Sequence, residues 1–124
     1  MPDPATVHGK VCYIQMPAKD IEVSAAFYTG VFGWTTRLHD DGTLAFDDAT
    51  GQVSGMWQTD LTAAADPGMI ISIMVRDVTT SMAEVIAAGG SIESMSDPED
   101  SETLATFRDP AGNLLCLYQD PGFE

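Results

Sequence analysis

The chain has 124 residues, of which 44% are hydrophobic, and a formal net charge of −14. Its length fits one domain with one core. The negative charge opposes approach to nucleic acid phosphates and anionic lipid surfaces, and no apolar run reaches the roughly 18 residues of a membrane span. The start of the chain also lacks a basic and then apolar leader. We therefore expect a cytoplasmic protein whose partners include neither nucleic acid nor membrane.

One pattern occurs twice, at an offset of 57 residues from Asp20 to Asp77. Each copy has an apolar strand-like run that ends at the aspartate, then a helix-like stretch that leads to Gly33 or Gly90. Repeats of this length are single supersecondary units that cannot bury their apolar faces alone. The sequence thus predicts one domain over residues 1–124, in which two modules close against each other around a cleft.

The first module, predicted at residues 8–60, reads as a strand, a helix and three strands. Asp20 can accept hydrogen bonds from the first amides of the helix, and Gly33 can end it. Turns rich in Asp and Gly separate the short apolar runs that follow. The predicted elements are a strand at 11–16, a helix at 21–32 and strands at 34–38, 44–47 and 53–58.

The second module, predicted at residues 68–120, follows the same order after an Ala-rich connector. Ser81 and Glu84 have the spacing of a capping box, and Gly89 and Gly90 end the amphipathic stretch that begins near Val78. The predicted strands are 69–75, 91–95, 104–107 and 114–118.

Two phrases of the sequence carry a family resemblance. They are AFY leading to VFGW at residues 26–34, and RDPAGN at residues 108–113. Placed in a doubled βαβββ pattern, they make nearly the whole chain resemble the vicinal oxygen chelate superfamily. This superfamily includes glyoxalase I, extradiol dioxygenases, fosfomycin-resistance enzymes and bleomycin-resistance binding proteins. The resemblance implies an α+β fold, with two βαβββ modules closing into a cup-shaped, barrel-like mixed sheet, and a homodimer.

Enzymes of this superfamily hold a divalent metal with four side chains, typically His, Gln or Glu, from four strands of the cup. By resemblance, these positions fall on Tyr13, Ile70 and Cys116, with the fourth within residues 54–58, where there is no carboxylate or histidine. Such side chains do not form the donor set that the metal requires. We therefore expect no metal, no other cofactor and no catalytic residue. Metal-dependent glyoxalase or dioxygenase activity is not expected.

The cup is expected to hold a small molecule instead. Alternate residues of a strand share one face, so an apolar, sulfur-rich and aromatic wall with few polar groups would line it. Trp34 and Trp57 offer stacking surfaces. The candidate binding residues are Tyr13, Gln15, Trp34, Met56, Trp57, Gln58, Ile70, Ser72, Met74, Cys116 and Tyr118.

Three functions stay open. We favour a metal-free protein that binds a small apolar or aromatic molecule. The second is a superfamily enzyme, lyase, isomerase or dioxygenase-like, that works without metal or with ligands at other positions, using Tyr13 and Gln15. The third is a non-catalytic structural or interaction module. Cys116 is expected to pack rather than to act as a nucleophile, because no cationic or basic residue lies in its strand.

Overall fold

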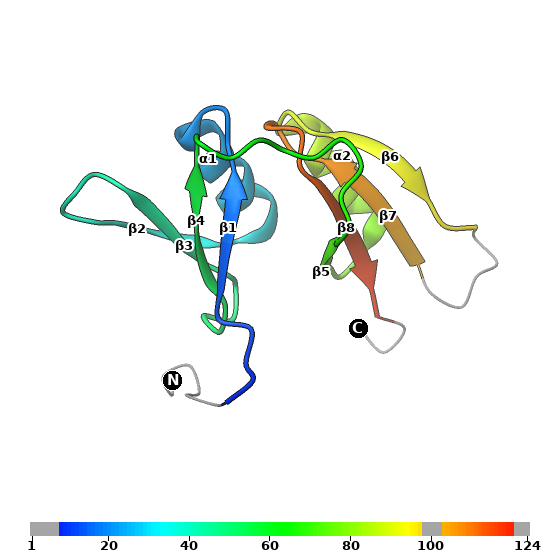
Figure 1. Ribbon diagram of the computed structural model, residues 1–124. Helices are drawn as coiled ribbons and strands as arrows, with labels where there is room; N and C mark the ends of the chain where they lie inside the picture. The colour runs from blue at the N-terminus through cyan, green and yellow to red at the C-terminus, as the bar shows by residue number, and fades with distance from the viewer. Residues whose placement is uncertain (1–7, 98–102, 121–124) are drawn as a thin grey trace.

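Two βαβββ modules follow each other along the chain in the computed structural model, which describes residues 8–97 and 103–120 (Figure 1). The predicted order of elements is confirmed. The outer limits predicted for the domain, residues 1 and 124, lie outside the described residues. The elements are β1 (Tyr13–Pro17), α1 (Ile21–Phe32), β2 (Thr35–Leu38), β3 (Leu44–Asp47), β4 (Ser54–Gln58), β5 (Ile71–Met74), α2 (Val78–Ala87), β6 (Ser91–Met95), β7 (Thr103–Arg108) and β8 (Leu114–Gln119).

Each module forms a four-stranded mixed sheet, with strand orders β1-β4-β3-β2 and β5-β8-β7-β6. The first strand of each module pairs in parallel with the last, and the other pairs are antiparallel. The α+β fold class is confirmed. The two sheets are separate among the described residues and do not close into a barrel. They lie side by side, with β1 and β5 at the edges that face the other module (Figure 1). In the part of the chain that the structure describes, neither helix has the length and apolar character of a membrane span.

Helix α1 begins and ends as predicted. The Oδ1 atom of Asp20 accepts hydrogen bonds from the backbone amides of Glu22 at 3.0 Å and Val23 at 3.3 Å. Gly33 ends the helix with φ at 72°, in the left-handed region that a side chain disfavours. The helix therefore stops at a defined residue, and Trp34 follows at a fixed position.

Helix α2 begins one turn earlier than a capping box at Ser81 and Glu84 requires, so that prediction is wrong. Ser81 lies inside the helix, where its backbone amide donates to the Asp77 carbonyl at 3.0 Å. The amide of Val78, at the helix start, donates instead to the Gln119 side-chain oxygen at 2.9 Å. The cap thus comes from β8, which sequence spacing within the helix does not reveal.

The core is an aromatic cluster shared by both modules. Phe27 and Tyr28 from α1 are fully buried, as are Phe46 and Trp57 from the first sheet and Phe107 from the second. The Phe27 and Phe107 ring centroids are 6.1 Å apart, so α1 packs against the second module as well as its own sheet. Burial of each such side chain contributes about 1.5–3 kcal/mol, so this contact helps to hold the two modules together.

A buried carboxylate also connects the modules. Asp109, only 4% exposed, accepts four hydrogen bonds. Its Oδ2 atom accepts from the Tyr28 hydroxyl at 2.8 Å and from the Asn113 side-chain amide at 2.9 Å, and its Oδ1 atom accepts from the backbone amides of Ala111 and Asn113, both at 2.9 Å. The Asn113 amide also donates to the Pro17 carbonyl at 2.7 Å. Burial, reinforced by the Asp109 carboxylate, raises the pKa of Tyr28 well above its ordinary value, so its hydroxyl keeps the donated proton.

The connector at residues 59–70 is attached to the second module by Arg108. Its guanidinium donates from Nη1 to the Ala64 and Gly112 carbonyls at 3.0 Å and from Nη2 to the Ala65 carbonyl at 2.7 Å. A planar group with several fixed donors suits such a cluster of carbonyls. The Arg108 side chain therefore holds the connector against the turn before β8.

Replacement of Tyr28 by Phe is expected to lower the free energy of unfolding by about 1–3 kcal/mol, because a buried carboxylate loses one of its donors. The free energy is measured by urea denaturation. Tyr13→Phe is the matched control, since Tyr13 is 47% exposed and its substitution is expected to change stability by less than about 0.5 kcal/mol. Equal unfolding midpoints for the two variants would contradict the role of the Tyr28 hydroxyl.

Candidate functional site

Each sheet has a helix face, on which α1 or α2 packs, and an open face on the other side. In the first sheet, register pairs Tyr13 with Ser54 and Gln15 with Met56, so these side chains share the open face. Gln58, two residues after Met56, lies on the same face. Trp57 lies on the helix face and is 1% exposed, with its ring centroid 6.1 Å from that of Tyr28. Of the two tryptophans predicted to bind ligand, Trp57 is thus part of the core.

The candidate residues of the second module lie on the open face of the other sheet. Ser72 pairs with Cys116 and Met74 with Tyr118. Ile70 precedes β5 and, like Met74, is exposed. As predicted, alternate residues of each strand share one face of the sheet. However, Tyr13, Met56, Gln58, Cys116 and Tyr118 line none of the three cavities described in this structure.

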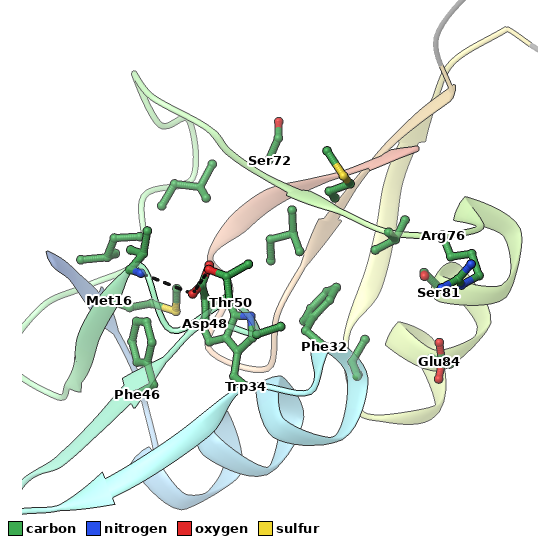
Figure 2. A pocket seen from close by; sticks show the side chains of 18 residues that line it. Met16, Phe32, Trp34, Phe46, Asp48, Thr50, Ser72, Arg76, Ser81 and Glu84 are labelled. Atoms are coloured by element: carbon green, nitrogen blue, oxygen red, sulfur yellow. Dashed lines mark hydrogen bonds between the residues drawn. The ribbon is translucent and has the colours of Figure 1, made fainter. Parts of the chain in front are cut away.

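A cavity of about 470 Å³ lies between the modules on their helix faces (Figure 2). Trp34, Ser72 and Met74 are the predicted site residues that line it. Its size is within the usual range for a small-molecule site. The other lining residues are Ile14, Met16, Val31, Phe32, Phe46, Asp48, Ala49, Thr50, Val53, Ile71, Ile73, Val75, Arg76, Ser81 and Glu84.

Sequence reasoning considered one face of the strands only, and it missed Ile14 and Met16, which alternate with Tyr13 and Gln15 along β1. It also did not consider the helices and turns, from which Phe32, Asp48 and Glu84 reach the cavity. The signal that could have found the β1 and β5 residues is the position of these strands as the first strand of each repeat. Each is an edge strand among the described residues, so its apolar side chains border the space between the two modules.

An aromatic stack forms one wall of the cavity. The ring centroid of Trp34 is 4.6 Å from that of Tyr28 and 4.8 Å from that of Phe46, with both ring pairs stacked. Figure 2 shows Trp34, Phe32 and Phe46 on the same side of the cavity. Because Tyr28 is itself held by Asp109, the wall is fixed before any ligand arrives. Such a wall can stack on a flat apolar molecule without a loss of side-chain entropy.

The polar groups of the cavity lie at its rim. Asp48 is held in the β3–β4 turn, because its Oδ1 atom accepts from the Thr50 hydroxyl at 2.8 Å and from the Gln52 and Val53 amides at 3.1 and 3.3 Å. Glu84 and Arg76 also line the cavity. The lining thus carries two acidic groups and one basic group in a chain of charge −14, so the local field disfavours anions.

The open face of the first sheet has a polar cluster that was not predicted. The guanidinium of Arg37 donates from Nε and Nη2 to Asp47 at 2.8 and 3.1 Å, and the Ser54 hydroxyl donates to Asp47 at 2.6 Å. These hydrogen bonds, Arg37 first, lower the pKa of Asp47. Gln58 lies at the other end of β4 from Ser54, outside this cluster, and its Oε1 atom is buried without a hydrogen-bond partner among the described residues. The cluster is solvent-exposed and satisfied internally, so it contributes little stability.

The metal implied by the family resemblance does not fit the residues present. Tyr13 and Ile70 are exposed to solvent, and neither lines the cavity. The Cys116 thiol donates to the Leu117 carbonyl at 3.4 Å. Within residues 8–97 and 103–120, no three His, Cys, Asp or Glu side chains are close enough to share an ion. No chemical step is therefore assigned to a metal.

Comparison with known proteins identifies similar domains. A family model described as a glyoxalase-like domain matches residues 13–118. A glyoxylase-like domain-containing protein from Didymella fabae is 40% identical over 38 residues, which are 31% of this chain and 30% of that protein. The alignment thus spans less than a third of the relative's length.

Solved structures with the same fold cover almost the whole chain. A glyoxalase/bleomycin resistance protein from Albidiferax ferrireducens T118 has a TM-score of 0.69 and 20% identity, covering 89% of this chain and 98% of that one. A glyoxalase/bleomycin resistance protein/dioxygenase family enzyme from Burkholderia phytofirmans PsJN has a TM-score of 0.71 and 19% identity, with 90% and 98% covered. The fosfomycin resistance protein FosX from Mesorhizobium loti has a TM-score of 0.69 and 13% identity, with 94% and 96% covered. At these identities the similarity is one of fold.

We expect protein incubated with Ni²⁺, Zn²⁺, Mn²⁺ or Fe²⁺ and then desalted to retain no stoichiometric metal, because the donor set is incomplete. Native mass spectrometry measures the bound ion. The exposed thiol of Cys12 can bind Zn²⁺ without a built site, so Cys12→Ser is the control. Retention of one ion per chain by Cys12→Ser would contradict the expectation.

Proposed function

The chain belongs to the glyoxalase-like domain family, and we propose that it binds a small, largely apolar or aromatic molecule without a metal or other cofactor. The observation that carries the proposal is the cavity of about 470 Å³ between the modules, with the aromatic wall of Trp34, Phe32 and Phe46. Apolar walls with a few polar groups are typical of small-molecule sites. The ligand carries no negative charge, since the rim and the whole chain are acidic.

The size of the cavity limits how much apolar area a ligand can bury, and thus how much binding free energy apolar contact can contribute. A ligand that buries about 200 Å² of apolar area gains roughly 5 kcal/mol by transfer from water. Lost translational and rotational freedom removes much of this gain. Contact with the aromatic wall adds about 0.5–1.5 kcal/mol, so micromolar affinity also requires hydrogen bonds.

The two other functions have less support from the structure. An enzyme that uses Tyr13 and Gln15 would work on an open, solvent-exposed face, where neither side chain shares an enclosed site with the aromatic wall. A purely structural module would fill the space between its sheets with its own side chains. The described chain instead leaves a cavity there, which favours binding.

Two copies of the chain are proposed to form a homodimer through Met69 and Ile70, which precede β5. Met69 is 89% exposed and Ile70 47%. Two adjacent, exposed large apolar residues offer an apolar contact for a second copy. Pairing would also cover the open faces that carry the other predicted site residues.

Binding in the cavity can be measured by the quenching of tryptophan fluorescence by a nitroaromatic ligand. Bound 4-nitrotoluene should quench the fluorescence of the protein saturably, and Trp34→Phe should remove most of this quenching because Trp34 forms the wall. Trp57→Phe is the matched control and should retain it, since Trp57 is in the core.

The anion 4-nitrobenzoate should bind at least about tenfold more weakly, because its charge must leave water and enter an acidic site. Equal quenching of both tryptophan variants, or no saturable binding of the neutral ligand, would contradict the proposed function.

The homodimer is expected to be detected as twice the chain mass by light scattering. Met69→Glu should shift the native mass toward the monomer, because a carboxylate would be buried in the interface. Ile86→Glu is the control, since Ile86 is 60% exposed on α2, outside this segment. A monomeric wild-type protein at micromolar concentration would contradict the pairing.

A further inference from the structure

We propose that the free edge of β5 is the recognition element of the cavity, and that its ligand carries two secondary amides, spaced as on either side of one peptide residue, which pair with the backbone of Ser72 and Met74. The inference rests on the proposed function and names the class of ligand: a neutral, apolar molecule with two such amide groups. The two amides would add to β5 as a short strand adds to a sheet edge.

The direction of the backbone groups follows from one hydrogen bond. The Val75 amide donates to the Tyr118 carbonyl at 2.8 Å, so Val75 faces β8. In a strand, the amide and carbonyl of one residue point to the same side, and successive residues alternate. Ser72 and Met74 therefore direct two amides and two carbonyls away from β8. Since β5 is an edge strand, no other strand among residues 8–97 and 103–120 receives them.

These groups border the cavity. All six residues from Ile71 to Arg76 line it, although their side chains alternate between the two faces of the sheet. Figure 2 shows the Ser72 hydroxyl pointing away from Trp34 and Phe32, so Ser72 borders the cavity with its backbone. The backbone hydrogen bonds described outside helices and strands do not involve Ser72 or Met74.

Strand β1 borders the same cavity in a different way. It contributes the side chains of Ile14 and Met16, whereas Tyr13, Gln15 and Pro17 are not among the lining residues. Ile14 and Met16 have the same parity as Ala18, whose amide donates to the Gln58 carbonyl at 2.9 Å, so their backbone groups face β4. One side of the cavity thus supplies apolar contact and the other side supplies hydrogen-bonding groups.

An apolar ligand without polar groups would bury these amides and carbonyls unpaired, which opposes binding. A residue-like centre between two secondary amides removes this cost, because its N–H and its C=O point to the same side and can pair with the Ser72 carbonyl and the Met74 amide. The geometry therefore favours amides over hydrocarbons of the same size, and over anions, which the acidic rim disfavours.

Neutral model amides test this preference by titration calorimetry on the full chain. N-acetylphenylalanine N-methylamide is expected to bind about tenfold more tightly than its analogue methylated on both amide nitrogens, which retains the apolar body but has lost its donors. Equal affinity of the two compounds would overturn the inference.

Substitution of the strand gives a second, independent readout. Met74→Pro removes an amide that points away from β8, so the β5–β8 pairing is retained, as proline at a sheet edge allows. Met74→Ala is the matched control, because it loses the same side chain but retains the amide. Relative to Met74→Ala, Met74→Pro should weaken the model amide about tenfold, whereas the two variants should bind 4-nitrotoluene equally. Circular dichroism checks that each variant folds.

The outcomes separate the two proposals. Binding of 4-nitrotoluene with no preference for the secondary amide, or with no effect of Met74→Pro, would overturn the amide inference and leave the cavity function intact. Absence of binding by both the nitroaromatic and the amide would overturn the proposed function itself.

Discussion

The hydrogen bond between Tyr28 and Asp109 is the interaction on which the arrangement of the molecule depends. The residues lie 81 positions apart, and each belongs to one of the two phrases that carry the family resemblance. Tyr28 anchors α1 in the aromatic core, and Asp109 organises the turn into β8 through the Ala111 and Asn113 amides. A buried carboxylate with four donors tolerates little displacement, because each lost partner costs free energy. The position of one module is thereby coupled to that of the other.

The width of the cavity follows from this coupling. Trp34 stacks on Tyr28, and Tyr28 is held by a carboxylate of the second module. The aromatic wall is therefore tied to the module that contains β5. For the proposed ligand, such a site would need little ordering of the protein on binding.

The sequence was sufficient for the fold because local signals and the repeat agree. Asp20 and Gly33 bound α1 through capping chemistry, which depends only on neighbouring residues. The cap of α2 could not be found in this way, since Gln119 reaches Val78 from another strand. Whether the two sheets close into a barrel could not be predicted from the sequence either. Closure depends on whether the edge strands β1 and β5 pair, and such pairing leaves no residue pattern within either strand.

The candidate site was only partly predictable, for a related reason. Alternation correctly separated Tyr13 and Gln15 from Ile14 and Met16, but it cannot tell which face borders a cavity. Trp34 and Trp57 both belong to the buried aromatic core, yet only Trp34 also lines the cavity. That distinction depends on how the two modules pack against each other. The expectation of no metal rests on residue type alone, since Tyr13 and Ile70 are poor ligands in any arrangement.

The contact between Asn113 and Pro17 has a consequence for solubility. Open strand edges invite pairing with other molecules and thus aggregation, and β1 is such an edge. Its last residue, Pro17, has no amide hydrogen, and its carbonyl already accepts from Asn113 at 2.7 Å. The end of β1 therefore offers neither a donor nor a free acceptor to an incoming strand, which protects this edge against pairing with a strand of another molecule.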